Sequence, residues 1–208
     1  MRLILARHGN TFGPGDPVVW VGARTDMPLV EKGRAQAEAI ADGLIAAGLS
    51  PSCVWAGPLK RTAETAAIVA RRCGLAADAV ISAEELREID YGTWEGLSND
   101  EIRAEVGDEA IDGWQKRSIW PDGFGWRPSK AEILANWDRL VATIAATCHP
   151  DAAVVIVSSN GIFRLVARTL GLAPNEAKMN TGALARLELE GRDLRVLAWN
   201  LDPTRLAP

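Results

Sequence analysis

Histidine and cysteine are scarce in this 208-residue chain, and the shortage excludes several classes of site. The histidines are His8 and His149, and the cysteines are Cys53, Cys73 and Cys148. They do not have the spacing of a Cys/His zinc cluster, and no CxxC pair occurs. The sequence therefore predicts no metal centre. Three reduced structural thiols are typical of a cytoplasmic protein.

Long apolar runs and nucleotide-binding glycine patterns are also absent. The first apolar run ends at Arg7, too short for a signal-peptide core, and no stretch approaches the roughly 18 apolar residues of a membrane span. The chain contains neither GxGxxG nor GxxxxGK[ST] nor GxSxG. A formal net charge of −4 disfavours a nucleic-acid partner. We therefore expect a cytoplasmic protein with no cofactor, no nucleic acid and no membrane association.

Short apolar runs alternate with longer amphipathic stretches along the chain. Nearly continuous apolar runs are typical of strands that helices cover on both faces, and they occur at 3–6, 53–56 and 153–157. Helical spacing and helix-stop glycines predict helices at 31–47, 58–73 and 160–171. Capping boxes predict two more helices, which begin after Ser98 and Ser129.

The last quarter of the chain predicts a hairpin at a sheet edge, with strands at 184–189 and 194–199 around a turn at 190–193. Strand–helix alternation before that hairpin indicates an α/β fold. We expect a three-layer sandwich with a mostly parallel central sheet and helices on both faces. The length suits one domain, residues 1–208.

Residues 98–130 interrupt this alternation and are predicted to form an insertion. Its part from 107 to 128 is rich in glycine, proline and tryptophan. Ligands of open α/β sheets bind beyond the carboxyl ends of the strands, so the insertion could serve as a lid there. Alternatively, its tryptophans only attach it to the body. Five tryptophans suggest an apolar or ring-shaped ligand group: Trp20, Trp94, Trp114, Trp120 and Trp126. The other three, Trp55, Trp137 and Trp199, fit core patterns.

Three segments carry residues suited to phosphoryl transfer. His8 follows the first strand beside Arg7, and a neutral imidazole can accept a phosphoryl group whose oxygens a guanidinium binds. Arg61 lies in the first turn of the helix after the second strand, where it can reach back over the strand ends. Glu88 lies between apolar and aromatic residues, which raise the pKa of a carboxyl group and suit it to donate a proton.

In chain order, these motifs resemble the phosphoglycerate mutase-like branch of the histidine phosphatase superfamily. The resemblance covers residues 3 to about 100 and resumes from 153 to 206, with motifs Arg7-His8-Gly9, 22–33, 58–62 and 88–96. It implies a phosphohistidine enzyme acting on a phosphorylated small molecule. In that case His8 accepts the phosphoryl group, Arg7 and Arg61 hold it, and Glu88 protonates the leaving oxygen.

The chain departs from the family at the second catalytic histidine, where Ser159 stands. His149 cannot replace it, because the intervening strand spans roughly 16 Å and puts His149 at the opposite sheet edge. We expect His149 to cap a helix end there. Ser159 and Asn160 can still donate hydrogen bonds to a phosphate, together with Asn10 and Thr11 after the first strand. Losing one optimised donor slows catalysis by about 10²–10³-fold.

Two smaller departures are Arg205, where the family often has histidine, and Ala56-Gly57, where it has a serine pair. The sequence thus supports a phosphomonoester hydrolase that is slow or specialised. The alternatives are a phosphate-binding module without turnover and a mutase-type phosphotransferase. The oligomeric state cannot be predicted from these patterns.

Overall fold

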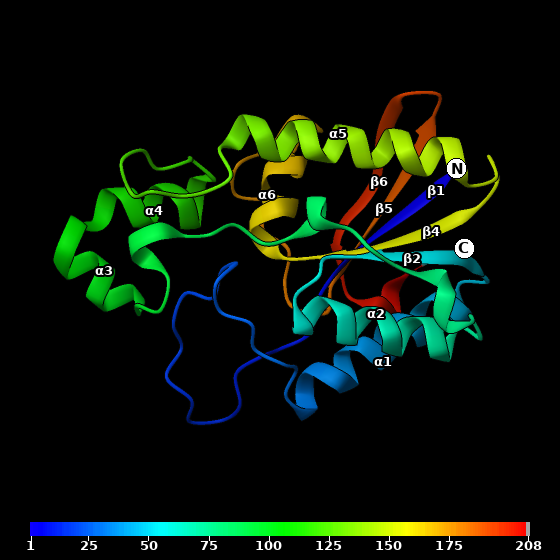
Figure 1. Cartoon of the computed structure of the whole chain (residues 1–208), viewed down its shortest axis with the longest axis horizontal. Coiled ribbons are helices and arrows are strands. Elements are labelled where there is room, and N and C mark those ends of the chain that lie inside the picture. The colour runs from blue at the N-terminus through cyan, green and yellow to red at the C-terminus, as the bar shows by residue number, and fades with distance from the viewer. Residues whose placement is uncertain (207–208) are drawn as a thin grey trace.

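A computed structural model describes residues 1–206 and has a single six-stranded sheet in that range, with strand order β3–β2–β4–β1–β5–β6 (Figure 1). Four neighbouring strands are parallel and the last two form the antiparallel edge hairpin, so the expected sheet is confirmed. The bounds are β1 Arg2–Arg7, β2 Pro51–Ala56, β3 Val80–Ser82, β4 Ala153–Ser158, β5 Leu184–Glu190 and β6 Asp193–Leu201.

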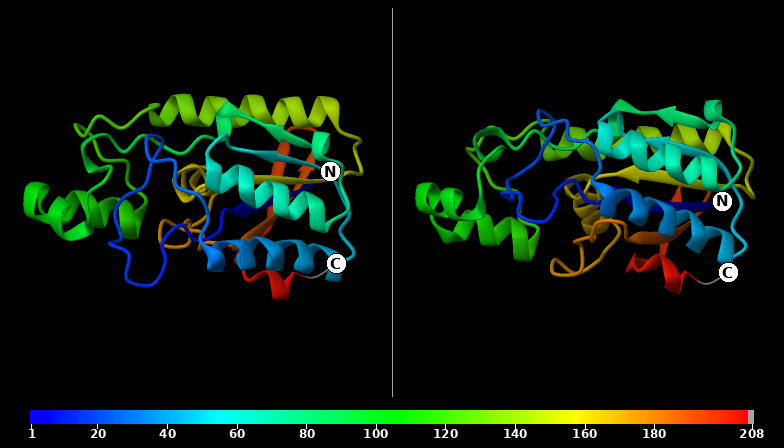
Figure 2. Two further views of the ribbon diagram at one scale, coloured as in Figure 1. Left: turned by 60° about the horizontal axis from the view of Figure 1, so that its bottom comes forward. Right: turned by 90° about the horizontal axis from the view of Figure 1, so that it is seen from below.

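Helices cover both faces of this sheet (Figure 2). Side chains alternate along a strand, so neighbouring residues of β1 enter different cores. Leu3 and Leu5 pack in the core beneath α5 (Lys130–Thr147) and α6 (Asn160–Thr169). Ile4 and Ala6 pack in the opposite core, against α1 (Glu31–Ala46) and α2 (Lys60–Arg72). The three-layer arrangement is therefore confirmed, with β1 and β4 in its centre.

Most expected element ends lie close to the observed ones. The side chains of Ser98 and Ser129 form capping boxes at α3 (Asn99–Val106) and α5. Helix α2 begins at Lys60, two residues later than expected, because Leu59 keeps an extended conformation. Strand β3 was not predicted, since three residues are too few to show an alternation. The 3₁₀ turns are η1 Ala77–Ala79, η2 Glu84–Leu86, η3 Gly92–Trp94 and η4 Pro203–Arg205.

The insertion contains a helix that the glycine-rich pattern did not indicate, α4 (Asp108–Arg117). Gly107 separates it from α3 with a φ of 78°, a conformation that glycine adopts readily. Both helices lie beyond the carboxyl ends of the parallel strands (Figure 1). The insertion at 98–130 and its role as a lid both stay predictions.

Seven aromatic rings gather between the insertion and the body. The rings of Trp94 and Trp126 meet edge to face at 5.2 Å between centroids, and Trp114 meets Trp126 at 5.0 Å. Trp94 is fully buried. Packing of this kind attaches the insertion to the body of the protein, which is what the alternative interpretation expected. We call this set the aromatic cluster: Trp20, Tyr91, Trp94, Trp114, Trp120, Phe124 and Trp126.

The structure of residues 1–206 can be searched for a membrane span and for a metal centre, neither of which the sequence predicts. In that range no helix has both the length and the apolar character needed to cross a bilayer. The same residues contain no group of three or more His, Cys, Asp or Glu side chains arranged to hold a metal ion. The three cysteines are free thiols.

Candidate active site

A cavity of about 290 Å³ lies at the carboxyl ends of the parallel strands. It brings together residues from β1, α2, α6 and the segment around Glu88, which are far apart in the sequence. Of the eight site residues expected from the sequence, seven line it: Arg7, His8, Asn10, Thr11, Arg61, Glu88 and Asn160.

His8 lies at the end of β1 with its imidazole held in the neutral form. Its Nδ1 lies 2.7 Å from the carbonyl oxygen of Gly9. A carbonyl only accepts hydrogen bonds, so we assign the ring proton to Nδ1 and the lone pair to Nε2. Burial lowers the pKa of His8 well below 6.5, and the charges of Arg7 and Arg61 lower it further. The imidazole is therefore unprotonated at neutral pH.

The glycine after His8 is required by close packing. A Cβ atom at Gly9 would lie only 2.7 Å from Cα of Gly33 and would clash with the Gly33 carbonyl oxygen. The backbone of the His8 loop therefore rests directly on the first turn of α1. A side chain at position 9 would push the loop, and the imidazole with it, away from the cavity.

Arg7 and Arg61 form the cationic part of the site. Arg7 Nη1 donates to the carbonyl of Met179 at 2.6 Å, and Arg61 donates to the carbonyls of Thr25 at 2.9 Å and Gly22 at 3.1 Å. Burial lowers the pKa of Arg7 to about 10, so Arg7 stays charged at neutral pH. Burial also lowers the pKa of Arg61, whose charge the carboxylate of Glu88 supports. Two fixed guanidinium groups beside a neutral imidazole are suited to bind a phosphoryl dianion.

Glu88 is the buried acid of the site, with 4% of its surface exposed. Burial raises the pKa of its carboxyl group, although the charge of Arg61 and two backbone donors oppose the change. These donors are the N–H groups of Ile89, at 2.9 Å, and Gly161, at 3.2 Å. They fix the carboxyl in the cavity wall, where it can donate a proton.

Gly161→Ala is expected to lower kcat by about 10–10²-fold, because ångström-scale misplacement of a catalytic group has effects of that size. The new Cβ would clash with Glu88 Oε1 and lie 2.6 Å from the hydroxyl of Tyr91. Steady-state kinetics checks the loss. Gly113→Ala is the control, because a Cβ there meets atoms only at 3.6 and 3.8 Å. Equal kcat in the two variants would contradict the positioning role of Gly161.

The remaining expected contacts differ in what they do. Asn10 and Thr11 line the cavity in the loop after His8, and the backbone N–H of Asn10 is fixed by Gln36 Oε1 at 2.8 Å. Asn160 also lines it and accepts from the N–H of Met179 at 3.0 Å through Oδ1. Ser159 is fully buried and is not among the lining residues, and its Oγ has no hydrogen-bond partner within residues 1–206.

His149 lies before β4, at the opposite end of the strand from Ser159, as expected. The expected helix cap is wrong. Helix α5 ends at Thr147, and Nδ1 of His149 accepts from the backbone N–H of Asp151 at 3.2 Å. The ring therefore closes a turn, and with 76% of its side chain exposed it takes no part in the cavity.

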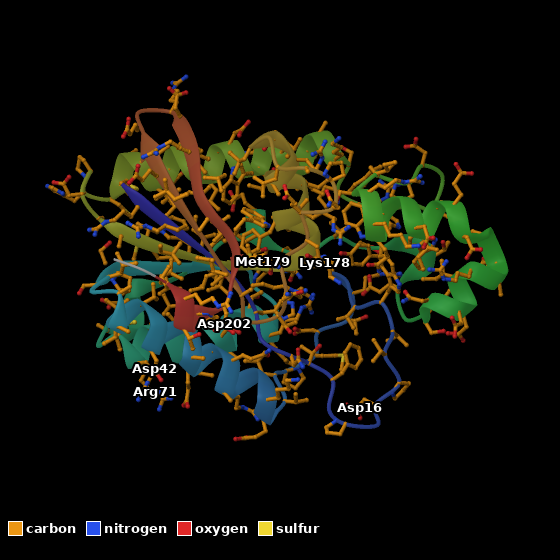
Figure 3. All side chains as sticks on the ribbon, turned by 180° about the vertical axis from the view of Figure 1, so that it is seen from behind. Asp16, Asp42, Arg71, Lys178, Met179 and Asp202 are labelled. Atoms are coloured by element: carbon orange, nitrogen blue, oxygen red, sulfur yellow. The ribbon has the colours of Figure 1, made fainter. Side chains whose placement is uncertain are left out.

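The cavity has further walls that motif reasoning missed. Residues 8–30 contain no helix or strand, and a long structureless loop is often functional, so this stretch could have been flagged. Figure 3 shows Asp16 at the outer tip of this loop and Met179 near the end of the sheet. The additional lining residues are Phe12, Val18, Val19, Trp20, Val21, Tyr91, Asn99, Trp114, Gln115 and Thr181.

Arg164 holds one of these walls in place. Its guanidinium is buried, donates to the carbonyls of Trp114 and Gln115 and lies 5.0 Å from the centre of the Trp114 ring. A cation at the carboxyl end of a helix is favourable, so Arg164 ties the end of α4 to α6. Arg164 thus adds to the aromatic cluster in fixing the insertion beside the cavity.

Comparisons with known proteins agree with this geometry. A family model described as the histidine phosphatase superfamily (branch 1) matches residues 3–202. Glucosyl-3-phosphoglycerate phosphatase of Mycobacterium tuberculosis is 27% identical over 97% of this chain and 92% of its own. A 2,3-bisphosphoglycerate-dependent phosphoglycerate mutase of Methylobacterium radiotolerans is 31% identical over 76% of this chain and 73% of its own.

A solved structure extends the likeness to three dimensions. The native structure of mycobacterial glucosyl-3-phosphoglycerate phosphatase superposes with a TM-score of 0.78 at 28% identity, covering 97% of this chain and 99% of its own.

Proposed function

Because the chain belongs to the histidine phosphatase superfamily, branch 1, we propose that it is a phosphomonoester hydrolase acting through a phosphohistidine at His8. The observation that carries this proposal is the surroundings of His8. The imidazole is neutral with its lone pair on Nε2, and Arg7, Arg61 and Glu88 line the same cavity. These are the nucleophile, the phosphate-binding cations and the acid that the reaction needs.

The first step transfers the phosphoryl group to the protein. Nε2 of His8 forms a bond to phosphorus as the ester P–O bond breaks, and the electron pair goes to the leaving oxygen. The protonated carboxyl of Glu88 gives that oxygen its proton, so the leaving group departs as a neutral alcohol. Arg7 and Arg61 neutralise the charge on the other phosphoryl oxygens.

The second step returns His8 to its starting state. A water oxygen attacks phosphorus, the N–P bond breaks, and its electron pair returns to Nε2. The Glu88 carboxylate takes the proton of the attacking water and is again an acid. Inorganic phosphate then leaves the cavity, and neither step requires a metal ion or an organic cofactor.

A phosphate-binding module without turnover is the second candidate, and Ser159 is the observation that favours it. No imidazole stands at that position to add charge to the transition state, and His149 is exposed at the far end of β4. A mutase is the third candidate, supported by the names of several relatives. It would have to hold a bisphosphate, and Arg7 and Arg61 are the only Lys or Arg among the described lining residues.

Trapping a phosphoenzyme tests the proposal. The protein is mixed with a radiolabelled phosphomonoester and quenched in alkali, which preserves phosphohistidine, and the label is mapped by mass spectrometry. We expect label on His8 that is lost on exposure to acid. Binding of inorganic phosphate without label or phosphate release, across a panel of phosphomonoesters, would favour the binding module and overturn the hydrolase.

Ser159→His is expected to raise kcat by about 10²–10³-fold, the effect of one optimised donor at a developing oxyanion. Position 159 directly precedes α6 and is next to Asn160, which lines the cavity, so the longer side chain would lie beside the cavity. Thr181→His, which adds an imidazole to another wall, is the control and should give no such gain. An unchanged kcat in a Ser159→His protein with normal thermal unfolding would show that a missing cation does not limit the rate.

A further inference from the structure

One wall of the cavity carries no charged side chain. It is built from the loop at 12–21 and from the ends of α3 and α4, and its residues are Phe12, Val18, Val19, Trp20, Val21, Asn99, Trp114 and Gln115. All of these are apolar, aromatic or neutral amide side chains. Among the described lining residues, Arg7 and Arg61 are the only cations, and both lie on the side of His8.

Both arginines are assigned to the phosphoryl group. Each is anchored by donation to backbone carbonyls, and the charge of each acts on His8. A carboxylate or second phosphate on the leaving group would therefore meet the neutral wall. Placing an anion there without a partner is unfavourable, because its lost hydration is not replaced.

The aromatic part of the wall is rigid before any ligand binds. The indole Nε1 of Trp20 donates to Asn99 Oδ1 at 2.9 Å, and its ring meets Tyr91 edge to face at 5.0 Å. Backbone hydrogen bonds of 2.9 Å join Trp20 to Leu97 and to Gly96. Trp114 is fixed from behind by Arg164 and Trp126. Fixed aromatic rings favour a flat, apolar partner, since little side-chain freedom is lost on binding.

The loop continues this apolar strip to the rim. Val18 is 69% exposed and lies next to Val19 in the cavity wall. Near the loop tip, the backbone N–H of Gly13 donates to Asp16 Oδ2 at 2.7 Å, which closes the turn. A ligand group that leaves the cavity would therefore pass along valine side chains and not along charges.

From this wall we infer that the leaving group of the substrate is an uncharged alcohol or phenol that carries a ring. The inference rests on the proposed hydrolase and specifies the substrate class for the same site. The volume of about 290 Å³ leaves room for a phosphoryl group and about one ring system. Asn99 and Gln115 supply neutral hydrogen-bonding groups that can orient a polar substituent on that ring.

Matched esters test the inference. Benzyl phosphate and 4-carboxybenzyl phosphate differ only in a carboxylate distant from the reacting oxygen, and ethyl phosphate lacks the ring. We expect kcat/KM for benzyl phosphate to exceed that for each of the others by at least about tenfold. A ratio near one, or a preference for the carboxylate, would overturn the inference.

A second test of the inference adds a positive charge at the rim of the cavity. Val18→Lys is expected to raise kcat/KM for the carboxylate ester, relative to benzyl phosphate, by about twofold to fivefold, the size of an exposed ion pair. Ile119→Lys adds the same charge at a residue that is 53% exposed and outside the cavity, and should leave the ratio unchanged. An unchanged ratio in Val18→Lys, or an equal change in Ile119→Lys, would contradict the placement of the leaving group.

The two proposals fail in different ways. If phosphate esters are hydrolysed but benzyl phosphate has no advantage, the hydrolase stands and the neutral-wall inference is wrong. If no ester yields phosphate or a phosphoenzyme, the hydrolase itself is wrong, and the inference falls with it.

Discussion

His8→Ala is expected to abolish phosphoenzyme formation and to lower kcat by about 10⁴–10⁶-fold, the range seen when an enzyme loses its nucleophile. His8 is the only imidazole among the described cavity residues, so no neighbour can take over the attack. Hydrolysis of a generic phosphomonoester, measured with phosphate-release and phosphoenzyme assays, checks the loss.

The chain contains its own matched control for this change. His149→Ala removes the other histidine, which is exposed at the far end of β4, and should leave kcat unchanged. Free imidazole added to the His8→Ala protein should restore part of the rate, because the deletion leaves space where a nucleophile can bind. Activity comparable to that of the unaltered protein would mean that another group attacks phosphorus.

Glu88→Gln is expected to lower kcat by about 10²–10⁴-fold for esters with a poor leaving group, the usual contribution of a general acid. Benzyl alkoxide must be protonated as it leaves, whereas 4-nitrophenolate is stable without a proton. The variant should therefore hydrolyse 4-nitrophenyl phosphate much better, relative to the unaltered protein, than benzyl phosphate. Glu84→Gln removes an exposed carboxylate of the same segment and should show no such selectivity. Equal losses for both esters would exclude Glu88 as the acid.

The pH dependence has a defined sign. Burial raises the pKa of Glu88 above its ordinary 4.5, and the reaction needs the protonated carboxyl. kcat/KM for benzyl phosphate should therefore fall as pH rises through this raised pKa, and the fall should be absent in Glu88→Gln. Because the pKa of Glu88 is higher in the folded protein than in the unfolded chain, the free energy of unfolding should also fall as pH rises from 4.5 through the raised pKa. A pH–rate profile with the same alkaline limb in the variant would contradict this assignment.

Local patterns predict the fold where one segment decides its own structure. The apolar run 153–157 is buried on both faces in β4, and Ser98 and Ser129 cap their helices as expected. Local patterns do not predict α4, because the glycines at 107 and 113 interrupt the apolar spacing of a helix. They also do not show the aromatic cluster, since contacts between Trp94 and Trp126 depend on the path of the chain in three dimensions.

The candidate site likewise contains residues that local patterns predict and residues that only three-dimensional packing brings into the cavity. Arg7, His8, Arg61 and Glu88 could be predicted because their motifs occur in the order of a known family, and the cavity contains all four. Thr181 could not be predicted, because it lines the cavity only through the packing of its loop. For Phe12 the length of the loop at 8–30 was a signal, but no motif singled out the residue. The loop of Thr181 is held by Gln36, a residue of α1 that no motif connects to it.

The central position of β1 has a consequence for synthesis on the ribosome. Arg2 pairs with Ala153 on one side and with Glu188 on the other, so β1 has no neighbouring strand until most of the chain is made. At about 5–20 residues per second, the intervening 150 or so residues take about 8–30 s to emerge. During that time the apolar residues of β1 stay unpaired in the nascent chain. His8 is therefore among the first residues made, whereas part of the cavity around it, including Asn160, is made much later.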